Sequence, residues 1–405
     1  MPTTSVIERP HAICFSRNEL LYVFITSDTS PAGLSIQIIL FFGGQQFTAN
    51  LKPDSNGKTY FYINGYIDSF LKYQLPSNQS TFITDAYSAQ SVEFYIHYRE
   101  VTDASTPAYV TSEESSHKRV AFNMGIIREK YSRNNFFANY FAYEKPWLTW
   151  LPSGRTVSHN QQIFLSTLIL PQHAGKILRL SIVATDIYGN DYVRSDYLGE
   201  VPSTGWLKHI NVSMAALQIA TLTSNPIDYY LVSIYESGTN DGIVSQYQFY
   251  VSYDHLYSYT DIHFFNSLGG LDSVRVIGEV ETALNKDYTE VDNGIDVNDW
   301  LATIKKADTS HVGITTYQSY KGDVGFLEDE AEQDAMTELL ISRSIWQYAD
   351  SRWLPVINLQ KSTSLRLSTA KTYSLPIEWR TAITNEVFTP SDVNLGIGTD
   401  VETYP

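Results

Sequence analysis

Short runs of β-branched and aromatic residues, separated by turn sequences, constrain the fold of this chain most strongly. Residues 21–25, 34–42, 60–63 and 92–98 have the length and composition of strands. Paired glycines at 43–44 and clusters of Pro, Asn, Asp and Ser stand between these runs, where they end strands. Short strands punctuated in this way predict an antiparallel β-sandwich.

The aromatic content supports the same interpretation. The chain has 29 Tyr, 19 Phe and 7 Trp, which together make up 14% of its residues. Aromatic residues suit half-buried pleated surfaces, so they favour strands over helices. Tyrosine also suits protein interfaces, because its ring can be buried while its hydroxyl stays hydrogen-bonded.

The strand pattern recurs along the chain. Strand-like runs that begin at residues 34, 60 and 91 have counterparts that begin at 178, 206 and 229. The spacing between counterparts stays at about 140 residues, which is typical of a duplicated unit. We therefore expect a mainly β protein with tandem antiparallel, Ig-like β-sandwich modules at residues 1–140 and 141–255.

The pattern changes after about residue 255. Residues 327–341 form a predicted acidic helix, with acids in the first turns, where they complement the helix dipole. Its predicted apolar face consists of Ala331, Ala335, Met336, Leu339 and Leu340. Two predicted strands follow at 353–359 and 373–379. We expect a smaller α+β module at residues 256–405, with a flexible acidic tail at 386–405.

Charge and cysteine content exclude several classes of protein. The net charge is −16 and no long basic stripe occurs, which argues against nucleic-acid binding. The single cysteine, Cys14, cannot form an internal disulfide. No signal peptide is visible, and no apolar run approaches the length of a membrane helix. We expect a soluble protein, without membrane insertion, made in a reducing cytoplasm.

Motifs for catalysis or cofactor binding are missing from the sequence. It contains neither the Gly-x-Ser-x-Gly of serine hydrolases nor a P-loop, and no His-Glu-x-x-His zinc motif. The acidic stretch 287–299 fails as an EF-hand, because that loop needs Gly at its sixth position, where Asp292 stands. We expect no catalytic residues, no metal and no cofactor. A glycoside hydrolase is harder to exclude, because its two carboxylates carry no short motif.

Two tryptophans beside prolines, Trp147 and Trp150, allow two interpretations. They can fill a junction between domains, or they can form an exposed platform on which a sugar stacks. A carbohydrate- or receptor-binding protein is therefore the alternative to a purely structural role.

Residues 262–281, IHFFNSLGGLDSVRVIGEVE, resemble the start of a phosphate loop. Since no Lys-Ser/Thr follows the glycines, a hairpin is the better prediction. We expect Gly269 and Gly270 to supply positive φ angles in the turn. Asp272 then begins the return strand, with Val274 and Val276 facing the core.

Several stretches together resemble virion tail proteins encoded by phages and prophages of Bacteroidetes hosts. They are ERPHAICFSRNELLYVF (8–24), PWLTWLPSGRTVS (146–158), FFNSLGGLDSVRVIGEVE (264–281), and, after the acidic helix, LLISRSIWQY, RWLPVINL and YSLPIEW. They occur in the expected order and span most of the chain. These stretches are packing and turn patterns, so the resemblance brings no catalytic residues with it.

The resemblance implies a structural baseplate, distal-tail or tail-hub component of the virion, assembled in the bacterial host cytoplasm. Its partners would be other copies of itself, in a ring or another symmetric oligomer, and neighbouring tail-tube, hub or fibre proteins. An acidic, disulfide-free, aromatic-rich chain is compatible with assembly through large β interfaces.

Overall fold

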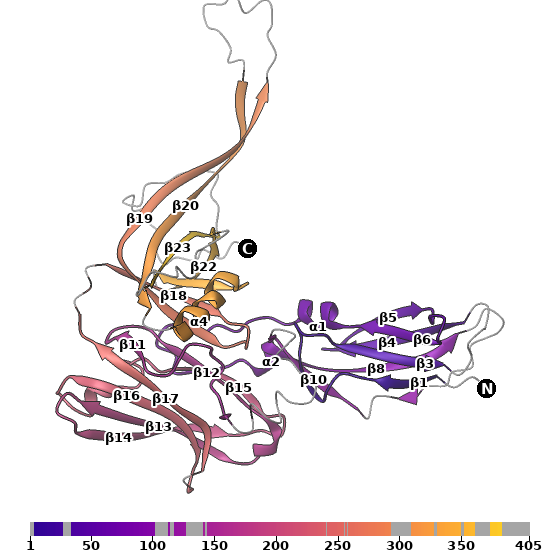
Figure 1. The fold of residues 1–405 in the computed structure, drawn as a ribbon, viewed down its shortest axis with the longest axis horizontal. Coiled ribbons are helices and arrows are strands. Elements are labelled where there is room, and N and C mark those ends of the chain that lie inside the picture. The colour runs from indigo at the N-terminus through magenta and orange to yellow at the C-terminus, as the bar shows by residue number, and fades with distance from the viewer. Residues whose placement is uncertain are drawn as a thin grey trace, which may run out of the picture.

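The computed structural model describes residues 4–26, 34–101, 112–113, 117–126, 141, 144–239, 241–254, 256, 258–292, 309–327, 330–349, 352–360 and 373–382. Strands make up 56% of the structure and helices 10%, so the prediction of a mainly β protein is confirmed. Two β bodies lie side by side, and a closed barrel with a long projecting arm stands against them (Figure 1). Among the described residues, no helix has both the length and the apolarity to cross a bilayer.

The first body contains two sheets packed around one core. The larger sheet has the order β2 (Ile13–Phe15), β10 (Arg119–Phe122), β8 (Ser91–Val101), β4 (Ser35–Phe42), β5 (Gln45–Leu51), with β9 (Ser112–Glu113) on β8. The smaller has the order β1 (Thr4–Glu8), β3 (Leu21–Thr26), β6 (Lys58–Tyr62), and the helices α1 (Asn64–Phe70) and α2 (Tyr87–Gln90) follow it in the chain. Burial alternates along β4, because its apolar residues Ile36, Ile38 and Leu40 face Phe24 and Phe61 of the smaller sheet in one core.

The second body repeats this arrangement. Its larger sheet has the order β11 (Arg155–Ser158), β17 (Gly242–Ser252), β16 (Ile227–Glu236), β13 (Ile177–Asp186), β14 (Asp191–Glu200). Its smaller sheet has the order β12 (Phe164–Ile169), β15 (Trp206–Asn211), β7 (Ile83–Asp85). Two 3-10 helices, η3 (Pro171–His173) and η4 (Ile219–Thr221), flank β13 and β16.

The two larger sheets correspond strand by strand. In each larger sheet, the strand that comes first in the chain pairs in parallel with the strand that comes last, as β2 does with β10 and β11 with β17. In each, the three central pairings are antiparallel. This equivalence agrees with the spacing of about 140 residues between the predicted strands.

One segment of the first half of the chain belongs to the second body. Strand β7 pairs with β15, with Ile83 opposite Ile210, and Phe82 and Ile83 pack against the second core. The expected division at residue 140 therefore does not describe every contact. A strand from one body completes a sheet of the other, so the two bodies are joined by backbone hydrogen bonds as well as by the chain.

The C-terminal part of the chain is a closed six-stranded barrel. Around it run β18 (Tyr259–Phe265), β19 (Leu271–Asp292), β20 (Thr309–Leu327), β23 (Tyr373–Thr381), β22 (Arg352–Asn358) and β21 (Ile345–Ala349). Helix α4 (Glu330–Ile341) begins three residues later than predicted, because β20 continues to Leu327. Ala335, Met336 and Leu339 pack on the barrel core as predicted, but Ala331 is exposed. The predicted tail at 386–405 lies outside the described residues.

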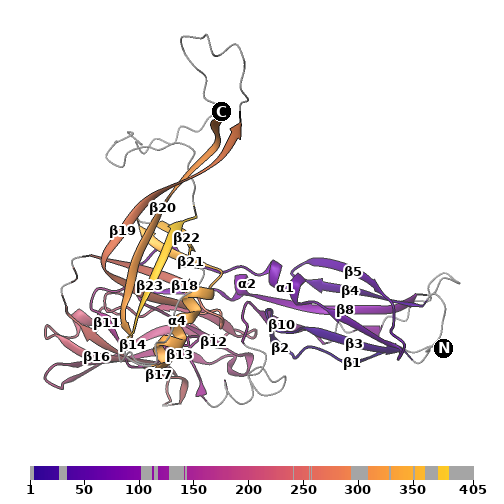
Figure 2. The same ribbon diagram turned by 45° about the horizontal axis from the view of Figure 1, so that its top comes forward.

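Strands β19 and β20 are much longer than the barrel needs. Their pairing continues from Glu281 opposite Lys321 to Asp292 opposite Thr309. Strand β23 pairs with β20 only up to Ser319, so beyond that point the two strands form a two-stranded ribbon. This arm, residues 284–292 and 309–318, projects away from both β bodies in Figure 1 and Figure 2.

Candidate functional site: the junction of the three bodies

The hairpin between β18 and β19 forms where all three bodies meet. Phe265 pairs with Leu271, the N–H of Asn266 donates to the Gly270 carbonyl, and the N–H of Gly269 donates to the Asn266 carbonyl. Gly269 has a φ of +72°, as the sequence predicts, whereas Gly270 does not adopt a positive φ. A Cβ on Gly270 would lie 1.8 Å from the Leu148 carbonyl oxygen, so close backbone approach is what requires glycine there.

The tip of this hairpin contacts each neighbour through a hydrogen bond. The Asn266 amide donates to the Leu148 carbonyl (2.8 Å), in the segment between the two β bodies. The N–H of Gly125, after the last strand of the first body, donates to the Ser267 carbonyl (2.7 Å). The N–H of Leu271 donates to the hydroxyl of Ser166 on β12 (2.9 Å). One turn thus connects the barrel to both sandwich-like bodies.

Helix α4 also contacts the tip. The Glu338 carboxylate accepts hydrogen bonds from the backbone N–H (2.7 Å) and the hydroxyl (2.9 Å) of Ser267. The Trp150 indole donates to the same hydroxyl (2.8 Å). Just beyond the C-terminal end of the same helix, Arg343 forms an ion pair with Asp68 of α1 (2.8 Å). The barrel is thereby held to the first body at two separate points.

Asp272 is buried behind the tip. The Asn266 amide donates to its carboxylate (2.6 Å). Burial raises the pKa of Asp272 to about 6, while the hydrogen bonds from Asn266 and Thr149 and the charge of Arg155 act in the opposite direction. A buried carboxyl with few charged neighbours is costly to ionise, and here it is part of the connection between the barrel and the Trp147–Trp150 segment.

Two buried serine–histidine pairs lie near the junction. Ser166 Oγ is 2.6 Å from His209 Nδ1, and Ser273 Oγ is 2.9 Å from His263 Nδ1. Burial lowers the pKa of His209 to about 3 and that of His263 to about 4, so both rings are neutral at pH 7. All four residues are at most 1% exposed, which leaves no space for a substrate at either serine.

The two predicted tryptophans lie inside the junction. Trp147 is 3% exposed, packs in the core of the second body and donates to the Ser245 carbonyl (2.8 Å). Trp150 packs against the barrel core and the apolar cluster between the bodies. Stacking of a sugar requires an accessible ring face, and the buried Trp147 ring does not offer one.

A buried ion pair within the barrel contacts the second body. Arg275 on β19 donates to both carboxylate oxygens of Asp261 on β18 (2.7 and 2.8 Å). The same guanidinium donates to the side chain and backbone of Asn160, and its Cζ lies 3.9 Å from the centre of the Tyr259 ring. Both charged side chains are almost fully buried, and Asp261 accepts a further hydrogen bond from the N–H of Gln162 (3.2 Å), so the pair is held by the second body as well as by its own charges.

Aromatic contacts fasten the barrel to the segment that leads into β7. The Phe265 ring stacks on Tyr73 with ring centres 4.1 Å apart. The Trp353 indole donates to the Pro76 carbonyl (2.7 Å). Together with the polar contacts at the hairpin tip, these rings leave the three bodies little freedom to move independently.

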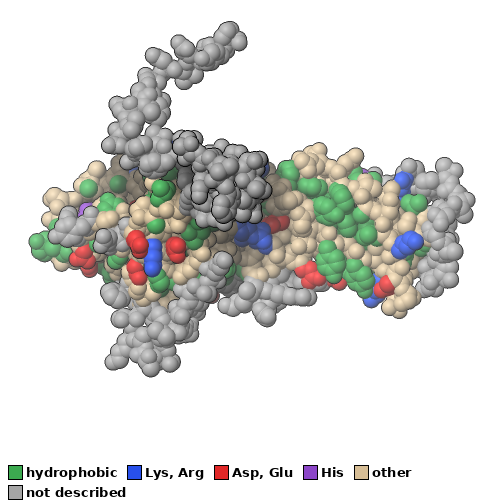
Figure 3. Space-filling view, turned by 90° about the horizontal axis from the view of Figure 1, so that it is seen from above, with side chains coloured by type: hydrophobic (Ala, Val, Ile, Leu, Met, Phe, Trp, Pro, Cys, Tyr) green, Lys and Arg blue, Asp and Glu red, His purple; other side chains and the backbone are tan. Residues whose placement is uncertain are grey.

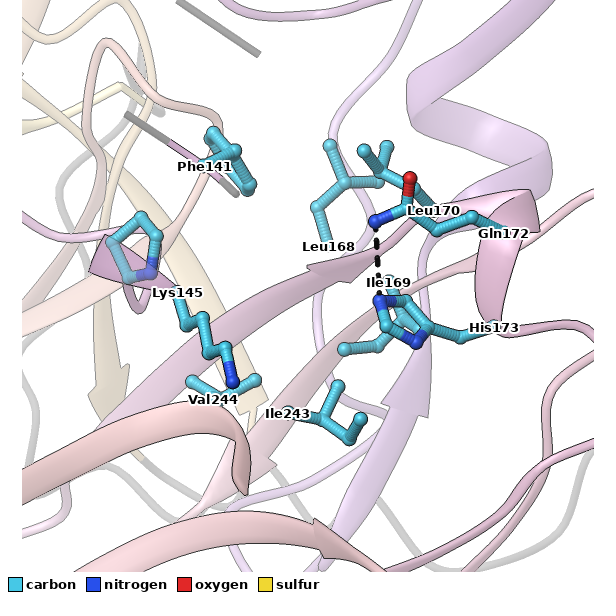
Figure 4. Close-up of a pocket in the computed structure, with 10 residues that line it drawn as sticks. Phe141, Lys145, Leu168, Ile169, Leu170, Gln172, His173, Ile243 and Val244 are labelled. Carbon is cyan, nitrogen blue, oxygen red and sulfur yellow. Dashed lines mark hydrogen bonds between the residues drawn. The ribbon is translucent and has the colours of Figure 1, made fainter. Parts of the chain in front are cut away.

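Cavities near the junction are small. The one in Figure 4 lies between η3 and the start of β17, with Lys145, His173 and Ile243 among its lining residues. Its volume is about 90 Å³, below the roughly 300–1,000 Å³ of ligand pockets. Burial, followed by the charges of Lys176 and Lys145, lowers the pKa of His173. Within the described part of the chain, His, Cys, Asp and Glu nowhere gather in threes suited to a metal.

Sequence reasoning identified the hairpin and the two tryptophans, but it missed the polar residues that connect the bodies. Ser273 and Arg275 alternate with Val274 and Val276, which is the pattern of a strand with one face in water. In the structure all of residues 271–276 are buried. The alternation predicts that Ser273 and Arg275 face solvent, but the second body covers that face. The one sequence signal of this burial is the high polar content of the two strands beside the glycine turn.

No protein-family model matches this chain, and no curated protein matches it in sequence.

Proposed function

We propose that this chain is a structural component of a phage virion tail, of the baseplate, distal-tail or hub type, and that it acts through protein–protein interfaces without catalysis. We further infer that its two equivalent bodies are tandem Ig-like sandwich modules. The alternative, a carbohydrate- or receptor-binding protein, cannot use Trp147, because that ring is buried.

The observation that carries this proposal is the arm. A two-stranded ribbon without further packing is marginally stable in water. Within the ribbon Leu284, Asp287 and Thr289 are exposed, and Leu284 lies on the face opposite to Asp287, so both faces of the ribbon are open. Leu284 is 57% exposed. A second copy of the chain would cover these faces, and an arm that reaches a neighbour is a means of closing a ring.

The rigid junction supports the same role. A part that transmits position from one neighbour to the next must hold its domains at fixed angles, and this chain does so with buried hydrogen bonds, the Arg343–Asp68 ion pair and stacked rings. Hydrophobic side chains gather in several groups on the first body, as Figure 3 shows. On the face drawn there, Lys and Arg lie in small separate groups, unlike the continuous basic surface of nucleic-acid-binding proteins.

Light scattering after size-exclusion chromatography, followed by electron microscopy of the purified protein, tests the proposal. We expect a symmetric oligomer. A variant without the arm tests its role. It replaces residues 284–318 with Asn-Gly, a sequence suited to a two-residue hairpin turn between Ala283 and Ser319, which are paired in the structure. This variant should fold and remain monomeric. If the full-length protein is monomeric both alone and in phage particles, the proposal is wrong.

A further inference from the structure

A polar groove of about 670 Å³ opens on the second body, within the size range of small-molecule sites. Four chain segments line it: residues 79–82 before β7, Gln162 before β12, residues 194–197 of β14, and residues 211–218 after β15. Strand β14 is the edge strand of its sheet, so the groove lies at an edge that no other described strand covers.

An arginine held in place from three sides forms part of the lining. Arg194 Nε donates to the Asp196 carboxylate (2.9 Å), and its Nη1 donates to the Leu217 carbonyl (3.1 Å) and to Oε1 of Gln218 (3.2 Å). The guanidinium is therefore ordered before any ligand arrives, which lowers the entropic cost of binding. Its side chain is still 26% exposed, so it remains accessible to a ligand.

The residue that orients this arginine has a strained backbone. Gln218 has φ 51° and ψ 38°, the left-handed conformation, which costs a non-glycine residue about 1–3 kcal/mol. Among the described residues that are not glycine, only Lys145 shares a positive φ. In this conformation the Gln218 amide oxygen accepts the hydrogen bond from Arg194.

Four residues of the lining carry a side-chain amide: Gln79, Gln162, Asn211 and Gln218. Asn211 donates to the Gln79 carbonyl (2.6 Å) and to Oε1 of Gln162 (3.3 Å), which joins three of the four segments. Within the described structure, no hydrogen bond involves Nε2 of Gln162 or Nε2 of Gln218. Amides offer a donor and an acceptor in one plane, which matches sugar hydroxyls, since each hydroxyl both donates and accepts.

We propose that this groove binds a neutral oligosaccharide. The lining contains one cation, Arg194, and one anion, Asp196, paired with each other, so it has no net charge to attract an acidic ligand. Tyr197, which is 59% exposed, adds an aromatic side chain whose apolar face can pack against a sugar ring. A binding groove of this kind is independent of the proposed assembly role, and would let an assembled particle hold a surface glycan.

Saturation-transfer NMR and calorimetry with maltotriose, cellotriose, mannotriose and tri-N-acetylchitotriose test this proposal, with sialyllactose as the acidic comparison. We expect at least one neutral trisaccharide to bind with a dissociation constant of about 0.1–1 mM. Gln218→Gly removes the amide but relaxes the backbone, so it should fold normally and bind at least about tenfold more weakly. Gln246→Ala removes an exposed amide from β17 of the same body and should bind like the wild type.

Three results would overturn the proposal: no saturation transfer from any neutral trisaccharide at about 10 mM, unchanged affinity of Gln218→Gly, or binding of sialyllactose alone. The variant lacking residues 284–318 separates this inference from the assembly role. It should bind the trisaccharide as the wild type does while failing to assemble, and Gln218→Gly should assemble normally.

Discussion

The two halves of strand β19 have opposite environments. Residues 271–276 are all buried, although Asp272, Ser273 and Arg275 are polar, whereas residues 281–284 are all exposed, although Leu284 is apolar. In the buried half, Asp272 is hydrogen-bonded to Asn266, Ser273 to His263 and Arg275 to Asp261. The comparison shows that neighbouring bodies, not residue type, decide burial along this strand.

The largest effect is expected at the turn that begins this strand. Gly270→Val should lower the free energy of unfolding by at least about 4 kcal/mol, because its side chain would collide with the Leu148 carbonyl. Chemical denaturation measures the loss. Gly242→Ala, at a glycine with open space around its Cβ position and no positive φ, is the matched control and should change stability little. Equal stability of both variants would contradict the close approach.

Breaking the buried ion pair should have the next largest effect. Arg275→Met leaves Asp261 buried without its bidentate partner, at a cost of about 3–5 kcal/mol. Glu93→Gln breaks the exposed pair with Lys118 and should cost at most about 1 kcal/mol. Thermal unfolding of both variants gives the comparison. The double variant Arg275→Met with Asp261→Leu should regain much of the lost stability, and no recovery would contradict the assignment.

The buried carboxyl of Asp272 should give a smaller effect that depends on pH. Its pKa of about 6 in the folded protein lies above the ordinary value of 3.8, so the folded state binds the proton more tightly than the unfolded state. Its contribution is therefore most favourable below about pH 4 and is lost as pH rises through 6, by about 3 kcal/mol in total.

Asp272→Asn keeps an acceptor for Asn266 and removes the titration. Its stability relative to the wild type should rise between pH 4 and pH 7, measured as the difference in free energy of unfolding. His209 and His263 have lowered pKa values, so they destabilise the folded state in the same acidic range in both proteins. The contributions of these two histidines therefore cancel when the free energies of unfolding of the two proteins are subtracted. A difference that does not change with pH would show that Asp272 does not titrate in this range.

The smallest effect on stability is expected in the arm. Leu284→Asp should change the free energy of unfolding by at most about 0.5 kcal/mol, because the side chain is exposed and makes no core contact. The same substitution should reduce oligomer formation, since a charge would enter the interface with the second copy. Analytical ultracentrifugation of this variant and of Glu281→Gln, a substitution of an exposed residue just below the arm that adds no charge, measures the difference.

Local chemistry made several elements of this fold predictable. Runs of β-branched and aromatic residues between turn sequences identified β4, β8 and β16, and the regular spacing of such runs predicted a duplicated unit, with which the corresponding strands of the two larger sheets agree. The turn at Gly269 followed from its position between two strands. Helix α4 followed from its acidic start and the buried residues Ala335 and Leu339. Each of these signals depends on residues that are close together in the chain.

Contacts between distant segments could not be inferred in this way. The pairing of β7 with β15 joins residues more than about 100 positions apart in the chain. The closed barrel and the groove beside Arg194 are each formed by several separate segments. The alternation of polar Ser273 and Arg275 with apolar residues looks the same whether their face contacts another body or water.

The sequence by itself therefore predicted the mainly β class, many of the strands and helix α4, because hydrophobic periodicity and turn residues act over a few positions. Only the tertiary structure decided which polar residues are buried and which apolar ones are exposed. The reason is physical: the hydrogen-bond partners and the covering surface come from other bodies, and their approach is specified by packing across the whole chain.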